Sequence, residues 1–178
     1  EGLAPRRTVA LVGLMGAGKT TVGRRLAAAL GLPFADADHE IVAAAGQSVE
    51  AIFAEHGECE FRRGERQVIA RLLAGPVHVL ATGGGAFIDP RTRALMKERA
   101  ISIWLKAPIE VLMKRVAKRD DRPLLKESDP RAVMERLMAD RYPIYAEADI
   151  TIETGNGPHN NAVGLILDAL RVHLAKAE

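Results

Sequence analysis

The residues that decide the fold are Val9-Ala-Leu-Val12, followed directly by Gly13-Leu-Met-Gly-Ala-Gly18-Lys19-Thr20. The first four are apolar and prone to β-structure, which predicts a buried strand, and the next segment, Lys19–Leu30, has a helical period that ends at Gly31. The loop between them fits G-x-x-x-x-G-K-[ST] in the strand–loop–helix context that this phosphate-binding pattern requires. A glycine-rich turn that binds nothing is the alternative, and the correct flanking elements argue against it.

Each residue type in this phosphate loop (residues 13–20) has a physical role toward a nucleoside triphosphate. Glycines let successive backbone N–H groups converge on phosphate oxygens at the positive end of the following helix. Lys19 is expected to contact the β- and γ-phosphates of ATP, and the Thr20 hydroxyl is expected to ligate Mg²⁺. The predicted nucleotide contacts around this loop are Gly16, Ala17, Gly18, Lys19, Thr20 and Thr21.

Outward from the phosphate loop, short apolar runs alternate with longer segments of helical period. The further strands are predicted at residues 34–35, 77–81, 101–105 and 148–152. The further helices are predicted at 38–45, 48–73 with a break near Gly57, 90–99, 109–118, 130–142 and 160–175. This alternation predicts an α/β fold with three layers, α/β/α, around a five-stranded parallel sheet. The phosphate loop, in a sequence without a guanine-reading N-K-x-D segment, indicates that this fold is of the P-loop kinase type. We expect one domain over residues 1–178, with substrate-binding helices at about 38–73 and a lid at about 117–129.

The composition argues against several classes of partner. The chain has 25 basic and 23 acidic residues, a net charge of only +2, and 4% aromatic residues, which does not favour nucleic-acid binding. No stretch reaches the roughly 18–20 apolar residues that span a bilayer, and no signal-peptide pattern opens the sequence. Cys59 is the single cysteine, so we expect no intrachain disulfide and a reducing, cytoplasmic location. The absence of an excess apolar stripe favours a monomer.

Two carboxylates follow the second predicted strand, in Asp36-Ala-Asp38. Ligands of parallel sheets bind outside the carboxyl ends of the strands, where the phosphate loop and the turn Gly83-Gly84-Gly85 also fall. One carboxylate could hold a Mg²⁺-bound water while the other accepts a hydrogen bond from an attacking hydroxyl. Asp38 could also cap the helix that begins at His39.

A charge-dense segment with helical period runs from Gly57 to Arg66. Glu58 and Arg62 could form an i,i+4 ion pair on a solvated face. The planar guanidinium of Arg62 is equally suited to binding a carboxylate, and the neighbouring Phe61 could anchor the segment inward. The segment by itself leaves both interpretations open.

Together these motifs resemble the shikimate kinases, which are similar to the nucleoside monophosphate kinases among P-loop proteins. The resemblance covers nearly the whole chain, in the order and spacing of that family. It rests on the phosphate loop, Asp36-Ala-Asp38, Ile52-Phe-Ala-Glu-His-Gly-Glu-Cys-Glu-Phe-Arg-Arg63, the Gly83-Gly84-Gly85 turn, Arg122-Pro-Leu-Leu125 and Arg141-Tyr-Pro-Ile-Tyr145. It implies ATP-dependent phosphorylation of the 3-hydroxyl of shikimate, giving shikimate 3-phosphate and ADP, in aromatic amino-acid biosynthesis.

The resemblance also implies how the acid is held. Asp38 would bind the acceptor hydroxyls and act as a base or as an orienting group. Arg62 and Arg141 would clamp the shikimate carboxylate, with Glu65 orienting Arg62. The ring hydroxyls would be held by the backbone of three successive glycines, Gly83, Gly84 and Gly85.

On the nucleotide side, the resemblance implies that Asp36 supports Mg²⁺ through water, beside Thr20. Lys19 and Arg122 would neutralise charge on the transferring phosphates, with Arg122 in the lid. Arg115 would lie against the adenine. The loop after the last strand offers no residue that we can assign to the base.

Two rival functions stay open at this point. A small kinase of similar build, such as a gluconate kinase, also phosphorylates a hydroxy acid, although the D-x-D and F-R-R combination points away from it. A P-loop regulatory module could hold nucleotide without chemistry, although the set Lys19, Thr20, Asp36, Asp38 and Arg122 is intact.

Overall fold

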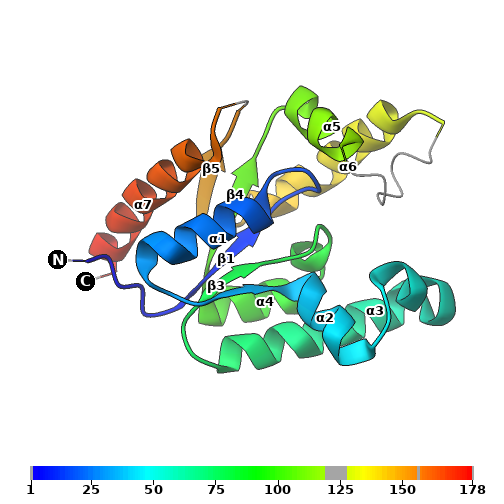
Figure 1. Cartoon of the computed structure of the whole chain (residues 1–178), viewed down its shortest axis with the longest axis horizontal. Helices are drawn as coiled ribbons and strands as arrows, with labels where there is room; N and C mark the ends of the chain where they lie inside the picture. The colour runs from blue at the N-terminus through cyan, green and yellow to red at the C-terminus, as the bar shows by residue number, and fades with distance from the viewer. Residues whose placement is uncertain (1, 119–127, 156, 178) are drawn as a thin grey trace.

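The computed structural model of the chain describes residues 2–118, 128–155 and 157–177 (Figure 1). Its centre is one parallel sheet of five strands, which confirms the predicted fold class. The strands are β1 (Thr8–Val12), β2 (Phe34–Asp36), β3 (Val79–Ala81), β4 (Ala100–Lys106) and β5 (Ile150–Glu153). Their order across the sheet is β2-β3-β1-β4-β5.

Helices cover both faces of this sheet. They are α1 (Lys19–Leu30), α2 (Ala37–Ala45), α3 (Val49–Ala74), the short 3₁₀ helix η1 (Ala86–Ile88), α4 (Pro90–Arg99), α5 (Ile109–Ala117), α6 (Pro130–Tyr145) and α7 (His159–Lys176). Helix α1 packs beside α7, and α3 packs beside α4 (Figure 1). Every residue of β1 is buried, as expected for a central strand with helices on both sides.

The order of the strands determines where a ligand can bind. After β1 the chain leads to β2 at one edge, and after β3 it crosses to β4 on the other side of β1. The neighbouring ends of β1 and β3 therefore form a topological switch point, the usual binding crevice of such sheets. In register, Leu11 lies opposite Ala81, and Ala81 lies opposite Asp36. The phosphate loop, Asp36 and the turn after β3 consequently leave the sheet at the same level.

The helix boundaries follow the capping residues. Asp36, in extended conformation, caps α2 by accepting a hydrogen bond from the His39 N–H at 3.2 Å. The alternative that Asp38 is the cap was therefore wrong, because Asp38 already lies in the first turn. Gly57 interrupts α3 with φ 80° and ψ 174°, at the predicted break.

Strand β5 begins at Ile150, two residues later than predicted, because a side chain replaces the backbone ladder there. The Asp149 carboxylate accepts a hydrogen bond from the Ser102 N–H at 3.0 Å, and the Asp149 N–H donates to the Ser102 hydroxyl at 2.9 Å. Most of the predicted lid, including Arg122, lies outside the described residues. No helix in the described part of the chain is long and apolar enough to cross a membrane.

Candidate active site

The phosphate loop has the backbone geometry of an anion cradle. Gly13 and Gly18 have φ values of 146° and 91°, which residues with a Cβ rarely adopt. A Cβ on Gly13 would also lie only 2.9 Å from the Leu105 carbonyl oxygen. Gly18 precedes α1, so the free N–H groups of the first turn open toward the loop. The glycines thus permit the close curl that the sequence pattern predicts.

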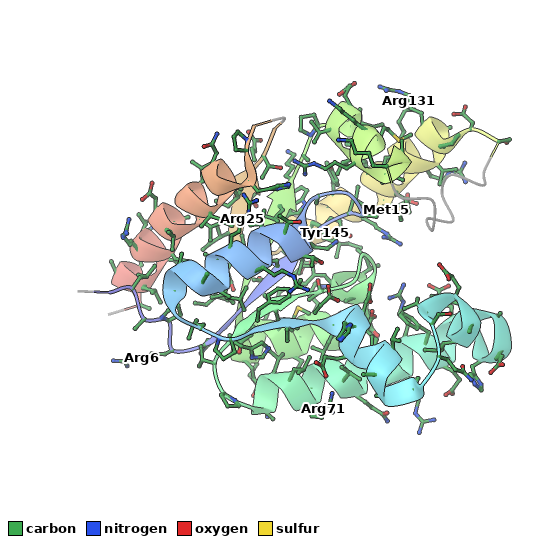
Figure 2. The ribbon with its side chains drawn as sticks, viewed as in Figure 1. Arg6, Met15, Arg25, Arg71, Arg131 and Tyr145 are labelled. Carbon is green, nitrogen blue, oxygen red and sulfur yellow. The ribbon has the colours of Figure 1, made fainter. Side chains whose placement is uncertain are left out.

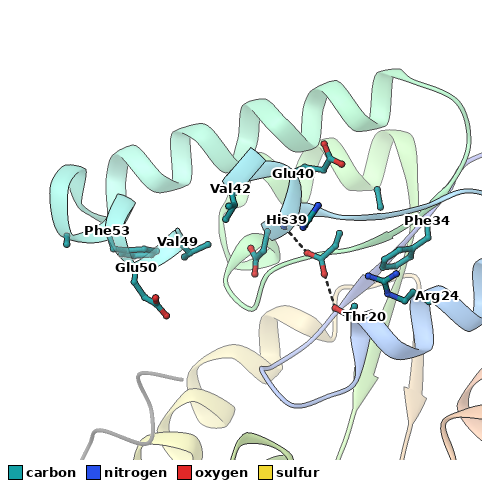
Figure 3. A pocket seen from close by; sticks show the side chains of 13 residues that line it. Thr20, Arg24, Phe34, His39, Glu40, Val42, Val49, Glu50 and Phe53 are labelled. Carbon is teal, nitrogen blue, oxygen red and sulfur yellow. Dashed lines mark hydrogen bonds between the residues drawn. The ribbon is translucent and has the colours of Figure 1, made fainter. Parts of the chain in front are cut away.

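Lys19 and Thr20, the first residues of α1, point their polar atoms to the two sides of this loop. The Lys19 ammonium donates to the carbonyl oxygens of Gly13 and Leu14, the second at 3.2 Å. The Thr20 hydroxyl donates to the Asp36 carboxylate at 2.9 Å, as the dashed line in Figure 3 marks. The Thr20 hydroxyl and the Asp36 carboxylate, which were both predicted to serve the metal ion, are therefore neighbours in the structure.

Arg115 on α5 joins the phosphate loop to the loop after β5. Its guanidinium donates to the carbonyl oxygens of Gly16 and Ala17, both at 3.1 Å, and to that of Gly155 at 3.3 Å. His159, at the start of α7, lies close enough that a Cβ on Gly18 would be 3.1 Å from its ring. Partial burial, together with the positive charges of Arg115 and Arg25, lowers the pKa of the His159 imidazole. Sequence reasoning missed His159, because only the folded chain places α7 beside the loop.

A cavity of about 410 Å³ brings these groups together. Its walls include residues 14–20 of the phosphate loop, Thr21, both aspartates, Thr82, Gly83, Gly84, Arg115 and His159. Thr82 fixes the position of this wall, because its N–H and its hydroxyl both donate to the Leu11 carbonyl oxygen, at 3.2 and 2.8 Å. The predicted nucleotide contacts among the described residues therefore line one space with Asp38, the predicted catalytic carboxylate, and Asp36, the predicted metal ligand.

Asp38 projects from the first turn of α2 toward the 83–85 turn (Gly83, Gly84 and Gly85). A Cβ on Gly83 would lie 2.7 Å from an Asp38 carboxylate oxygen and 3.3 Å from one of Glu65. Only glycine leaves room for both carboxylates at this position. Asp38 is half-buried and lines the 410 Å³ cavity, so its carboxylate borders the space next to the phosphate loop.

Arg62 and Arg141 converge on the 83–85 turn from separate helices. The Arg62 guanidinium on α3 lies directly against Gly85, where any Cβ would collide with it. The Arg141 guanidinium on α6 donates to the Gly84 carbonyl oxygen at 3.1 Å. Two cations 79 positions apart in sequence, at positions 62 and 141, thus contact adjacent residues.

The buried carboxylate of Glu65 fixes the position of the Arg62 guanidinium. Its Oε1 accepts a hydrogen bond from Arg62 at 2.8 Å, whereas the exposed Glu58 lies at 3.7 Å from the same guanidinium. The Glu58–Arg62 ion pair is therefore present, but the buried partner Glu65 makes the shorter contact. Glu65 is fully buried, and its Oε2 has no hydrogen-bond partner among the described residues.

A second and larger cavity of about 1220 Å³ adjoins the first, since Thr20, Asp36 and Asp38 line both. Figure 3 shows Val49 and Phe53 along its α3 side. These half-buried apolar side chains offer a wall for the carbon face of a small ring. The sequence analysis missed them because one Val and one Phe on a helix are indistinguishable from ordinary core residues.

Burial dominates the electrostatics of Glu65. Desolvation raises the pKa of its carboxyl above the usual 4.5, even though the charge and hydrogen bond of Arg62 act in the opposite direction. The nearby carboxylates of Asp38 and Asp89 raise it further. The folded state therefore binds this proton more tightly than the unfolded chain does, and ionised Glu65 costs stability.

The pH dependence of folding should reveal this cost. Because the pKa is raised on folding, the contribution of Glu65 to stability is complete below about pH 4.5 and is lost as pH rises through the folded-state pKa. In Glu65→Gln, the free energy of unfolding should therefore fall less between pH 4.5 and 8 than in the wild type. Urea titrations at four pH values measure this, and parallel curves for the two proteins would contradict the prediction.

The donors near the phosphate loop fit a magnesium ion. Mg²⁺ prefers oxygen ligands and keeps several waters, so one or two protein oxygens and the phosphates of a nucleotide suffice. Thr20 and Asp36 supply a hydroxyl and a carboxylate 2.9 Å apart. The described residues contain no cluster of three or more histidine, cysteine or acidic side chains that would bind a metal by themselves.

Comparisons with known proteins agree on one family. The sequence profile of the shikimate kinase family matches residues 15–171. A shikimate kinase from Caulobacter vibrioides is 60% identical over 173 residues, which cover 96% of this chain and 86% of that protein. The solved structure of the shikimate kinase from Acinetobacter baumannii in complex with shikimate has a TM-score of 0.89 and 40% identity, over 94% of each chain.

A gluconokinase from Sinorhizobium meliloti also has a similar structure. Its TM-score is 0.63 at 18% identity, over 99% of this chain and 97% of that one. At this identity the likeness concerns the fold alone.

Proposed function

The chain belongs to the shikimate kinase family, and on that premise we propose that it transfers the γ-phosphoryl group of ATP to the 3-hydroxyl of shikimate. The products are shikimate 3-phosphate and ADP. The observation that carries this proposal is the meeting of Arg62, Arg141 and Asp38 at the 83–85 turn, beside the phosphate loop. Two cations and one carboxylate around a small space suit a ring that bears a carboxylate and several hydroxyls.

On the acid side, Arg62 and Arg141 bind the carboxylate, and the 83–85 turn contacts the ring hydroxyls. Arginine suits this task because its planar fork matches the two oxygens of a carboxylate. Glu65 keeps the Arg62 fork in one orientation, which lowers the entropy lost on binding. Val49 and Phe53 pack against the ring.

Phosphoryl transfer then requires mainly alignment and charge neutralisation. Asp38 accepts the proton of the 3-hydroxyl as that oxygen bonds to the γ-phosphorus, while the bond from the γ-phosphorus to the bridging oxygen of ADP breaks. Lys19 and the loop N–H groups stabilise the charge on the phosphates. Thr20 and Asp36 would hold Mg²⁺, which supplies further neutralisation of the β- and γ-phosphates when bound.

Arg115 and His159 border the outer end of the nucleotide space, and we assign them to the adenine and its ribose. Arg122 keeps its proposed role toward the phosphates, in a lid at about 117–129. We further propose a single domain over residues 1–178 that acts as a monomer in the cytoplasm. Its near-balanced charge and its lone cysteine support this, and we expect no nucleic-acid or membrane partner.

A coupled ADP-release assay with MgATP tests the proposed reaction. Shikimate, gluconate and no acceptor are compared at equal enzyme concentration. We expect strong ADP release with shikimate alone. Release with gluconate instead would overturn the Arg62–Arg141 clamp, and no release from protein that binds ATP would favour a regulatory role.

The carboxylate clamp makes a separate prediction for Arg62→Lys. An ammonium cannot reproduce the bidentate geometry, so the KM for shikimate should rise by about 10- to 100-fold, with a smaller change in the KM for ATP. Steady-state kinetics with each substrate varied in turn measure the change in the KM for shikimate and in the KM for ATP. Arg63→Lys is the matched control, because Arg63 is the next residue on α3, exposed and paired with Glu60 at 3.7 Å. Equal KM values for the two variants would reject the clamp.

A further inference from the structure

We propose that Tyr145 is a positioning residue for the acid: its hydroxyl fixes the Gly84 carbonyl, and through it the 83–85 turn and Arg141. This inference rests on the proposed function, because it assigns the residue that keeps the proposed acid site in shape. The sequence motif Arg141-Tyr-Pro-Ile-Tyr145 assigns no role to this tyrosine, which lies in the interior of the molecule (Figure 2).

Two donors meet at one carbonyl oxygen. The Tyr145 hydroxyl donates to Gly84 O at 2.5 Å, and the Arg141 guanidinium donates to the same oxygen at 3.1 Å. Tyr145 follows Arg141 by four residues, so both side chains leave the same face of α6. Burial raises the pKa of the Tyr145 hydroxyl to about 12, which keeps it protonated and able to donate at any physiological pH.

The tyrosine ring is itself held in place by side chains from two other elements. It stacks on Phe87 of η1 at 6.4 Å between ring centroids, and it lies 5.7 Å from Trp104 of β4. Tyr145 is 0% exposed, so its hydroxyl cannot swing into solvent without leaving the core. The sheet and η1 therefore determine where the Gly84 carbonyl oxygen must lie.

A glycine turn needs such an anchor. Three successive residues without a Cβ leave the backbone free to rotate, and none of the three has a positive φ that would restrict it to a glycine conformation. The peptide unit between Gly84 and Gly85 is planar and trans, so its N–H points opposite to its carbonyl. Fixing the Gly84 oxygen toward Tyr145 therefore fixes the direction of the Gly85 N–H on the other side.

Arg141 and Tyr145, the two donors to the Gly84 oxygen, differ in what they must bind when the acid is present. Arg141 has five N–H donors and must direct some of them at the carboxylate. Tyr145 has one donor, is buried, and keeps the Gly84 oxygen satisfied while Arg141 adjusts. Without the tyrosine hydroxyl, Arg141 would have to satisfy the Gly84 oxygen and the acid together.

The test compares two tyrosines of α6. Tyr145→Phe removes the bond to Gly84 and keeps the ring in the core, so we expect the KM for shikimate to rise by about tenfold, kcat to fall by less than about threefold, and the KM for ATP to stay unchanged. Tyr142→Phe is the matched control. Tyr142 also packs on Trp104, at 4.8 Å, and also donates to a backbone carbonyl, but its hydrogen bond goes to Ala107 at 3.2 Å and not to the turn. Its kinetic constants should equal those of the wild type.

A readout independent of activity separates this inference from the proposed function. In ¹⁵N-labelled protein, the Gly85 amide should exchange with solvent faster in Tyr145→Phe than in Tyr142→Phe, whichever acid the enzyme uses. Equal exchange in the two variants would overturn the positioning role even if shikimate is the substrate. Equal rises in the KM for both substrates in both variants would also overturn it, because they would report a general packing defect. Inactivity of the wild type on shikimate would contradict the proposed function alone.

Discussion

Replacing Lys19 with methionine should lower kcat by about a thousandfold or more while leaving the fold intact. The Lys19 ammonium lies at the mouth of the phosphate loop, against the Gly13 and Leu14 carbonyls, where phosphate oxygens would take over as its partners. Methionine has a similar length and no charge, so the variant removes the cation from the phosphates with little change in packing. Single-turnover kinetics at saturating MgATP and acid measure the loss.

The control for this substitution is Lys97→Met. Lys97 is exposed on α4 and forms a 2.8 Å ion pair with Glu147, remote from the phosphate loop. The Lys97→Met variant should retain the kcat of the wild type, and both variants should give the circular dichroism spectrum of the wild type. A near-normal kcat for Lys19→Met would refute the role of the phosphate loop in catalysis.

Asp38→Asn should depress kcat by about 10²- to 10⁴-fold, the usual range for loss of a general base. The amide keeps the shape of the carboxylate next to Gly83, but it cannot accept the proton of the attacking hydroxyl. Because an amide can still hydrogen-bond a hydroxyl, the KM for the acid should change much less than kcat.

Asp168→Asn is the matched control for Asp38. Asp168 is an exposed carboxylate on α7, paired with Arg171 at 3.0 Å, and it lies outside both cavities. Its substitution should leave kcat unchanged. A mild effect of Asp38→Asn, of a few-fold only, would mean that Asp38 positions the acid and that the proton leaves by another route.

The fold could be predicted from the sequence because its signals are local. Each signal affects the conformation of residues only a few positions away. Examples are the apolar run at residues 9–12, the glycine pattern that follows it, and Gly31 after α1. Capping residues are local as well, and Asp129 with Pro130 starts α6 where it was predicted. The error at β5 comes from a distant contact: Asp149 bonds to Ser102 on β4, and its side chain takes the place of a backbone ladder bond, which the local period of the sequence cannot reveal.

The acid site could be predicted only in part. The glycine turn and the D-x-D pattern stand out by residue type, and Arg62 and Arg141 were assigned through resemblance to a family, with no contact between them evident in the sequence. Val49, Phe53 and His159 carry no local signal, and they were found only because α3 and α7 bring them to the cavities. Each is an ordinary residue in an ordinary helix until its neighbours are known.

By itself, the sequence determined the α/β fold, the phosphate loop and the presence of carboxylates after β2, since these follow from hydrophobic period, glycine conformations and strand ends. The tertiary structure alone decided that Arg62 and Arg141 meet at one glycine turn and that Tyr145 holds the carbonyl between them. The physical reason is that such meetings depend on strand order and on helix packing across the sheet. Strand order and helix packing result from the burial of apolar residues over the whole core, so no single segment of the chain determines them.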